Sequence, residues 1–64
     1  MHFLRATRRT NETLVLINVD HITAIQQETS DNTLYAVIIL HNGREIDVSE
    51  TLEELSQRLE SDTV

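Results

Sequence analysis

The arginines near the start of this chain have side chains whose chemistry suggests a ligand. Arg5, Arg8 and Arg9 are the only charged residues among the first nine, and Arg44 is the next arginine along the chain. A guanidinium offers a planar fork of N–H donors that fits a phosphate group. The arginines therefore define a candidate RNA- or phosphate-binding edge. The alternative is that they are solvated strand charges that protect a sheet edge and pair with acids.

Acidic residues dominate the other end of the chain, where Arg58 is the only base from position 45 onward. Glu50, Glu53, Glu54 and Glu60 would share a helix that could dock a basic partner or imitate a nucleic-acid backbone, as a small phage-type inhibitor of a nucleic-acid enzyme would. The alternative is an ordinary solvated helix face.

Metal binding and catalysis find little support in the remaining polar residues. His2, His21 and His41 lack the spacing of metal ligands. They could bind zinc only by meeting across an oligomer axis, so we expect exposed histidines and no metal. Acid–base catalysis by carboxylates needs a cavity that shifts their pKa values, and so short a chain has little room for one. We expect no enzyme activity and no cofactor.

The length of the chain favours self-association. Its 64 residues form one small domain, which buries only about 60% of the surface that the unfolded chain exposes. Burial of apolar surface then contributes roughly 100 kcal/mol, and ordering the chain costs almost the same amount. Small domains usually gain stability from disulfides, metals or oligomerisation. Because the chain has no cysteine, a homo-oligomer, dimeric or larger, is the expected remedy.

The net charge of −6 argues against general binding to nucleic acids or to anionic membranes. No apolar run approaches the roughly 18 residues of a membrane span, and the chain opens without a charged and apolar leader. We expect a soluble cytoplasmic protein.

Hydrophobic alternation predicts about five short strands, at residues 2–9, 13–18, 21–28, 33–40 and 44–48. Ile22 and Ile25 lie three residues apart, which indicates a bulge, a bend or a short helix within the third strand. The stretch 29–32 reads as a turn, and Asn42-Gly43 is the preferred pair for a two-residue hairpin with positive φ.

One amphipathic helix is predicted after the last strand. Ser49 is its expected N-cap, Leu52, Leu55 and Leu59 fall on one stripe, and Glu54 is expected to pair with Arg58. The predicted fold is α+β and mainly β: an antiparallel meander closed by a C-terminal helix. The domain spans residues 1–60, with a frayed tail at 61–64.

The middle strands carry apolar residues on both faces, which one short helix cannot cover. In the strand at 33–40, Leu34 belongs to one face, whereas Tyr35, Val37 and Ile39 belong to the other. Leu14 and Leu16 oppose Val15 and Ile17 in the same way. A second subunit would cover the surplus face, so these four residues of the fourth strand are the predicted oligomer interface; a tightly curled monomer is the alternative.

The segments "LINVDHITAI", "IILHNGREIDV" and "SETLEELSQRL" together resemble the FlbD-like family of small flagellar and swarming-associated proteins. The matching positions are Asn18, Ile22, Ile25, Asn42, Gly43, Val48 and the leucines of the helix. This resemblance covers nearly the whole chain. It implies an accessory role in bacterial motility and gives no mechanism.

A second resemblance begins at "TRRTNETL" and continues in "REIDVSETLEELSQRL", which are similar to the first and last strands and the helix of CsrA-like RNA-binding regulators. That resemblance implies a domain-swapped dimer with a basic RNA-binding edge. Ser49 and Glu50 stand where that family places an essential arginine, and a carboxylate beside a phosphate path repels RNA.

The sequence therefore favours a non-enzymatic, self-associating module that binds another protein. A divergent CsrA-like RNA binder is the second reading, and a small acidic inhibitor of a nucleic-acid enzyme is the third.

Overall fold

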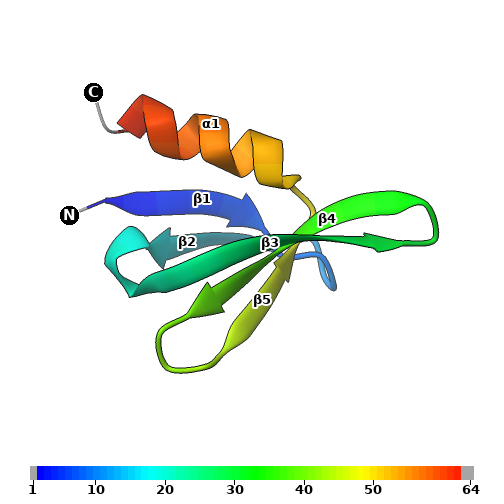
Figure 1. Ribbon diagram of the computed structural model, residues 1–64, viewed down its shortest axis with the longest axis horizontal. Coiled ribbons are helices and arrows are strands. Elements are labelled where there is room, and N and C mark those ends of the chain that lie inside the picture. The colour runs from blue at the N-terminus through cyan, green and yellow to red at the C-terminus, as the bar shows by residue number, and fades with distance from the viewer. Residues whose placement is uncertain (1, 63–64) are drawn as a thin grey trace.

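The computed structural model describes residues 2–62, with side chains described for residues 2–60. Its strands are β1 (Phe3–Thr7), β2 (Leu14–Asn18), β3 (Ile22–Ser30), β4 (Thr33–Leu40) and β5 (Glu45–Val48), followed by the helix α1 (Leu52–Asp62) (Figure 1). A 3-10 turn, η1 (Val19–His21), separates β2 from β3. The predicted α+β fold, mainly β with antiparallel strands and one C-terminal helix, is confirmed.

The strands form two antiparallel sheets that meet at one point. β1 and β2 make a hairpin, and β3, β4 and β5 make a meander. An isolated bridge between Arg8 and Val48 joins the end of β1 to the end of β5. There the Arg9 N–H donates to the Asp47 carbonyl and the Ser49 N–H donates to the Thr7 carbonyl, each over 2.8 Å. The strands therefore run β2-β1-β5-β4-β3 across both sheets.

The turns follow local chemistry, with two differences from expectation. β3 continues to Ser30, so the turn predicted at 29–32 is only two residues long. Asp31 and Asn32 link β3 to β4 with φ of 50° and 64°, the left-handed conformation that these residue types tolerate and that matches the twist of a hairpin. Between β4 and β5 the Arg44 carbonyl accepts from the Leu40 N–H, so three residues form the loop. Only Gly43 has a positive φ there, at 90°. The two-residue turn predicted at Asn42-Gly43 is therefore wrong.

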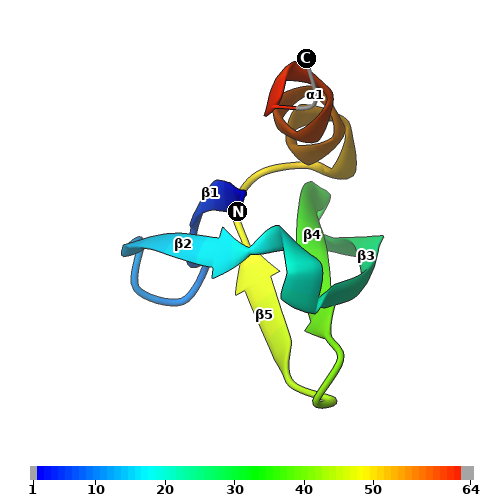
Figure 2. The same cartoon turned by 90° about the vertical axis from the view of Figure 1, so that its left-hand side faces the viewer.

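The irregular spacing of Ile22 and Ile25 has a clear cause. The register of β3 against β4 shifts between Ile22 and Ala24, which leaves one extra residue on β3. The predicted bulge is confirmed, and η1 supplies a short helical turn just before it. Asn18 caps η1, because its side-chain carbonyl accepts from the Asp20 N–H over 3.0 Å. The bend lets the chain pass from one sheet to the other within a few residues (Figure 2).

The hydrophobic core lies between the two sheets and the helix. It comprises Leu4, Ala6, Ile17, Ala36, Ile38, Val48 and Leu55. β1 and β4 each contribute two alternate residues, Leu4 with Ala6 and Ala36 with Ile38, as the period of two requires when one face of a sheet is buried. Ile22 and Ile25 of β3 are partly buried and pack against this core. The chain therefore curls its sheets together and covers most of the apolar β4 with its own residues.

The helix α1 lies along β1, as Figures 1 and 2 both show. Leu55 is fully buried, Leu59 is half-buried and Leu52 is exposed at the helix start. Thr51 is the N-cap: its hydroxyl accepts from the Glu54 N–H, and the Glu54 carboxylate accepts from the Thr51 N–H, each over 3.2 Å. This reciprocal capping box corrects the prediction of Ser49.

The helix ends at Asp62, so it includes the first two residues of the predicted tail. Residues 63–64 lie outside the described residues. Within residues 2–62, no helix combines the length and the apolar character that a membrane crossing needs.

Candidate interaction surface

The largest exposed apolar side chains cluster on the strand pair β1–β2. Leu14, Leu16 and Phe3 are 67%, 66% and 47% exposed. Leu14 lies opposite Thr7, Leu16 opposite Arg5, and Phe3 opposite Asn18. By the alternation of a strand, all of them share the side of the hairpin that faces away from the core. We call these three apolar residues, with Arg5 among them, the β1–β2 outer face.

The predicted oligomer interface on β4 is largely covered by the chain itself. Val37 is buried, because it lies opposite Gln26 of β3 and Asp47 of β5, and these side chains flank it. Tyr35 and Ile39 are half-buried. In this set only Leu34 is exposed, at 46%. Val37 is thus unavailable to a partner, and the surplus apolar surface lies on β2.

The arginines occupy four different settings. Arg5 lies on the β1–β2 outer face, and Arg44 follows the loop between β4 and β5. The guanidinium carbon of Arg9 lies 4.2 Å from the centre of the Tyr35 ring, a cation–π contact. Arg8, its neighbour in sequence, lines a hollow beside β5.

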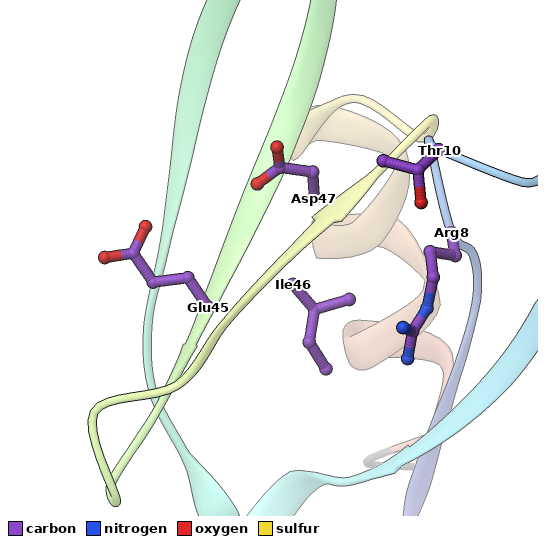
Figure 3. A pocket seen from close by; sticks show the side chains of 5 residues that line it. All are labelled: Arg8, Thr10, Glu45, Ile46 and Asp47. Carbon is purple, nitrogen blue, oxygen red and sulfur yellow. The ribbon is translucent and has the colours of Figure 1, made fainter.

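The hollow near Arg8 has a volume of about 250 Å³ and is lined by Arg8, Thr10, Glu45, Ile46 and Asp47. Figure 3 shows Arg8 and Ile46 on one side of β5, with the carboxylates of Glu45 and Asp47 on the other. A lining with one basic residue and two acidic residues does not make a basic path for a phosphate backbone. The contacts of Arg8 and Arg9 are thus with different partners, the hollow beside β5 and the Tyr35 ring.

Glu50 is the buried charged residue of the described chain. The Thr7 N–H donates to its Oε1 over 2.8 Å, and the Thr7 hydroxyl donates to its Oε2 over 3.0 Å. Arg58 Nη1 donates to Oε2 over 3.1 Å and to the Arg5 carbonyl over 2.7 Å. The pair of Glu50 and Arg58 thus binds the backbone of β1 where no strand lies beside it.

This geometry lowers the pKa of Glu50. Burial by itself would raise the pKa, because it removes water from the ionised carboxylate. Hydrogen bonds from the Thr7 N–H, from its own N–H, from Arg58 and from the Thr7 hydroxyl outweigh burial, so the pKa lies below its ordinary value. The carboxylate is held ionised and fully hydrogen-bonded.

The acidic partner face predicted for the helix is smaller than expected. Glu50 is buried and precedes α1, so it does not contribute to an exposed face. Glu53 and Glu54 are exposed in the first turn of α1. Glu54 bonds Thr51 and Arg58 bonds Glu50, so the predicted pair of Glu54 with Arg58 is replaced.

Two of the histidines meet within one chain. The rings of His21 and His41 contact edge to face, with centroids 5.0 Å apart. The His41 N–H also donates to the His21 carbonyl over 2.9 Å. Across residues 2–62, no group of three or more histidine and acidic residues is arranged to hold a metal ion.

Comparisons with known proteins do not assign this chain to a family: no protein-family model, no curated protein and no solved structure matches it. The resemblances to FlbD-like and CsrA-like proteins stay predictions.

Sequence reasoning missed the partners of Glu50 because 43 residues separate Thr7 from Glu50. The capping box was visible as Thr51 followed three residues later by Glu54. Leu14 and Leu16 were visible as the second apolar face of their strand. Their exposure depends on which strand lies at an edge, and alternation alone does not give that order.

Proposed function

We propose that this protein is a non-enzymatic interaction module that self-associates and binds a protein partner through the β1–β2 outer face. One observation carries the proposal: Phe3, Leu14 and Leu16 are large, apolar, exposed and together on one side of a hairpin. Small monomeric proteins leave single apolar residues exposed, whereas a contiguous group marks an interaction site.

Charge supports a protein partner over a nucleic acid. Arg5 is the only charged residue on the β1–β2 outer face, and the chain carries a net charge of −6. Nucleic-acid binding depends on several basic groups along one path. An apolar face with a single guanidinium fits the composition of protein interfaces, where apolar residues and arginine are enriched.

The resemblance to FlbD-like proteins supports a motility-associated role for this module. By that resemblance the protein is bacterial, and the cytoplasmic location expected from its composition is part of the proposal. Deletion of the gene in its source organism is expected to impair swimming or swarming, and a chain with Phe3→Ser and Leu14→Ser is expected not to restore it. Full restoration by that variant would exclude the β1–β2 outer face as the working surface.

Sedimentation equilibrium tests self-association directly. The wild-type chain is expected to exceed its monomer mass of 7.4 kDa at micromolar concentration. The double variant Phe3→Ser, Leu14→Ser is expected to remain a folded monomer. Leu34→Ser is the matched control, because it removes an exposed leucine from another strand. If the wild-type chain stays at 7.4 kDa at all concentrations, the proposed self-association is wrong.

Affinity capture tests the protein partner. Immobilised wild-type chain is expected to retain a specific protein from the source organism, and the double variant is expected to lose it while Leu34→Ser keeps it. A partner retained equally by all three chains binds elsewhere.

A further inference from the structure

The sheet edges of this protein are protected to different degrees. An exposed edge offers unpaired N–H and C=O groups to another strand, and proteins usually block it with charges, bulges or covering elements. The edge of β1 is covered by Glu50 and Arg58. The edge of β3 carries a bulge and Glu28. β5 contains Glu45 and Asp47 and meets β1 at one end.

The free edge of β2 has none of these protections. Its sequence, Leu14–Asn18, contains no charged residue and no proline. Apart from β1, no strand within residues 2–62 pairs with it. β2 is therefore the edge of this fold that is most open to another strand.

The hydrogen bonds at the two ends of the hairpin show which backbone groups point outward. The Arg8 N–H donates to the Thr13 carbonyl, and the Val19 N–H donates to the His2 carbonyl. In an antiparallel pair, hydrogen-bonded positions recur at every second residue. Val15 and Ile17 therefore point their backbone groups toward β1. Leu14, Leu16 and Asn18 point theirs toward the free edge.

We propose that β2 of one chain pairs antiparallel with β2 of a second copy, with Leu16 opposite its own counterpart and Leu14 opposite Asn18. This register uses the whole five-residue strand, because Leu16 is its centre. It unites two hairpins into one four-stranded sheet. The inference rests on the proposed self-association and defines its geometry.

A second copy fits this edge for reasons of symmetry and charge. A two-fold interface requires a surface that is complementary to itself, and a strand without charges meets its own copy without repulsion. The rest of the chain, at a net charge of −6, repels a second copy. The outer faces of the two hairpins then become continuous, so Phe3, Leu14 and Leu16 of both chains form one larger apolar surface for a protein partner.

The area available sets the expected strength. A stable interface buries about 800 Å² per partner, which is roughly a sixth of the 4577 Å² surface of this chain. Pairing of one five-residue edge buries less than that. We therefore expect a reversible dimer with a dissociation constant on the order of micromolar.

Single cysteines test the register, since the chain has none of its own. Directly opposite, hydrogen-bonded residues have Cα atoms about 5.5 Å apart, within the range of a disulfide. Leu16→Cys is thus expected to form a disulfide-linked dimer under mild oxidation at micromolar concentration. Leu14→Cys is the matched control: its counterpart lies four residues away along the strand, about 14 Å, so its yield is expected to be about tenfold lower.

Amide exchange in the wild-type chain gives a second readout that needs no substitution. The N–H groups of Leu14, Leu16 and Asn18 are expected to exchange about tenfold more slowly when concentration rises through the dimer range. The N–H groups of Val15 and Ile17 already bond β1, so their exchange should change far less.

The outcomes separate this inference from the proposed function. If the chain dimerises but Leu16→Cys cross-links no better than Leu14→Cys and the Leu16 amide gains no protection, the pairing of β2 is overturned. The proposed self-association would then still hold. Equal cross-linking of Leu16→Cys and Leu34→Cys would also overturn the β2 pairing. A chain that is monomeric at every concentration overturns both.

Discussion

The backbone groups at the two outer edges of the β1–β2 hairpin differ in whether they have hydrogen-bond partners. On the β1 side, the Glu50 carboxylate accepts from the Thr7 N–H and Arg58 donates to the Arg5 carbonyl. On the β2 side, the backbone groups of Leu14, Leu16 and Asn18 meet no other strand among residues 2–62. The same hairpin thus has one edge satisfied by distant side chains and one edge that stays open.

The difference shows how side chains can substitute for a strand. A carboxylate supplies two acceptor oxygens and a guanidinium supplies several donors, so together they satisfy a donor and an acceptor of the backbone. Because they come from Glu50 and from α1, closing the edge of β1 also fastens the helix. We therefore expect stability to depend on the β1 edge and the proposed association to depend on the β2 edge.

Among the variants that test this contrast, Leu55→Ala is expected to lower the free energy of unfolding the most. Leu55 is fully buried and packs α1 against the core. Its truncation should destabilise the fold by about 3 kcal/mol, from lost burial and the cavity left behind. Urea unfolding followed by circular dichroism measures the loss. Leu52→Ala, at the exposed start of the helix, is the control and should cost less than about 1 kcal/mol. Equal losses would mean that Leu55 does not anchor α1.

The next largest loss of stability is expected from Glu50→Ala, which removes the acceptor of the Thr7 N–H and the partner of Arg58. The cost should be about 2 kcal/mol, because a partly buried donor is left without its charged acceptor. Glu53→Ala is matched in chemistry and lies at an exposed position. It should change the free energy of unfolding by no more than about 0.5 kcal/mol. A Glu50→Ala chain as stable as Glu53→Ala would show that the β1 edge needs no cover.

The free energy of unfolding, measured as a function of pH, tests the role of the Glu50 carboxylate more specifically. Because folding lowers the pKa of Glu50, its ionised form stabilises the fold fully above about pH 4.3, the pKa of an unfolded glutamate. That stabilisation is lost as the pH falls through the lower folded-state pKa. The stability of Glu50→Gln should therefore lie below that of the wild type at neutral pH and approach it in acid. If the free energies of unfolding of the two chains differ by the same amount from pH 7 to pH 2, the Glu50 carboxylate does not stabilise the fold through this contact.

The smallest effect on stability is expected from Leu14→Thr on the open edge. Leu14 is 67% exposed, and threonine suits a strand, so the free energy of unfolding at a concentration where the chain is monomeric should change by less than about 0.5 kcal/mol. Self-association should nevertheless weaken. A loss of stability close to that of Leu55→Ala would place Leu14 in the core of a single chain.

Local patterns predicted the elements well. Alternation located every strand, and the spacing of Ile22 and Ile25 revealed the bulge on β3. Contacts between distant segments were not predictable in this way. The order of strands across both sheets depends on a bridge between Arg8 and Val48, and no local pattern encodes it.

That order decided the candidate site. β4 is the most apolar strand and therefore gave the predicted interface. Its central position in the meander hides Val37, whereas the edge position of β2 exposes Leu14 and Leu16. Glu50 was assigned to a helix face because it falls near the helix in sequence. Its carboxylate instead turns to β1, since an unpaired backbone N–H there needs an acceptor.

The junction of β1 with β5 also has a kinetic consequence. Each sheet is built from neighbours in sequence, whereas the bridge from Arg8 to Val48 closes a loop of about forty residues, and such closure costs entropy before it is rewarded. We expect the hairpin and the meander to form early and to dock late. Thr7→Ala should accordingly accelerate unfolding in stopped-flow experiments and leave the refolding rate nearly unchanged.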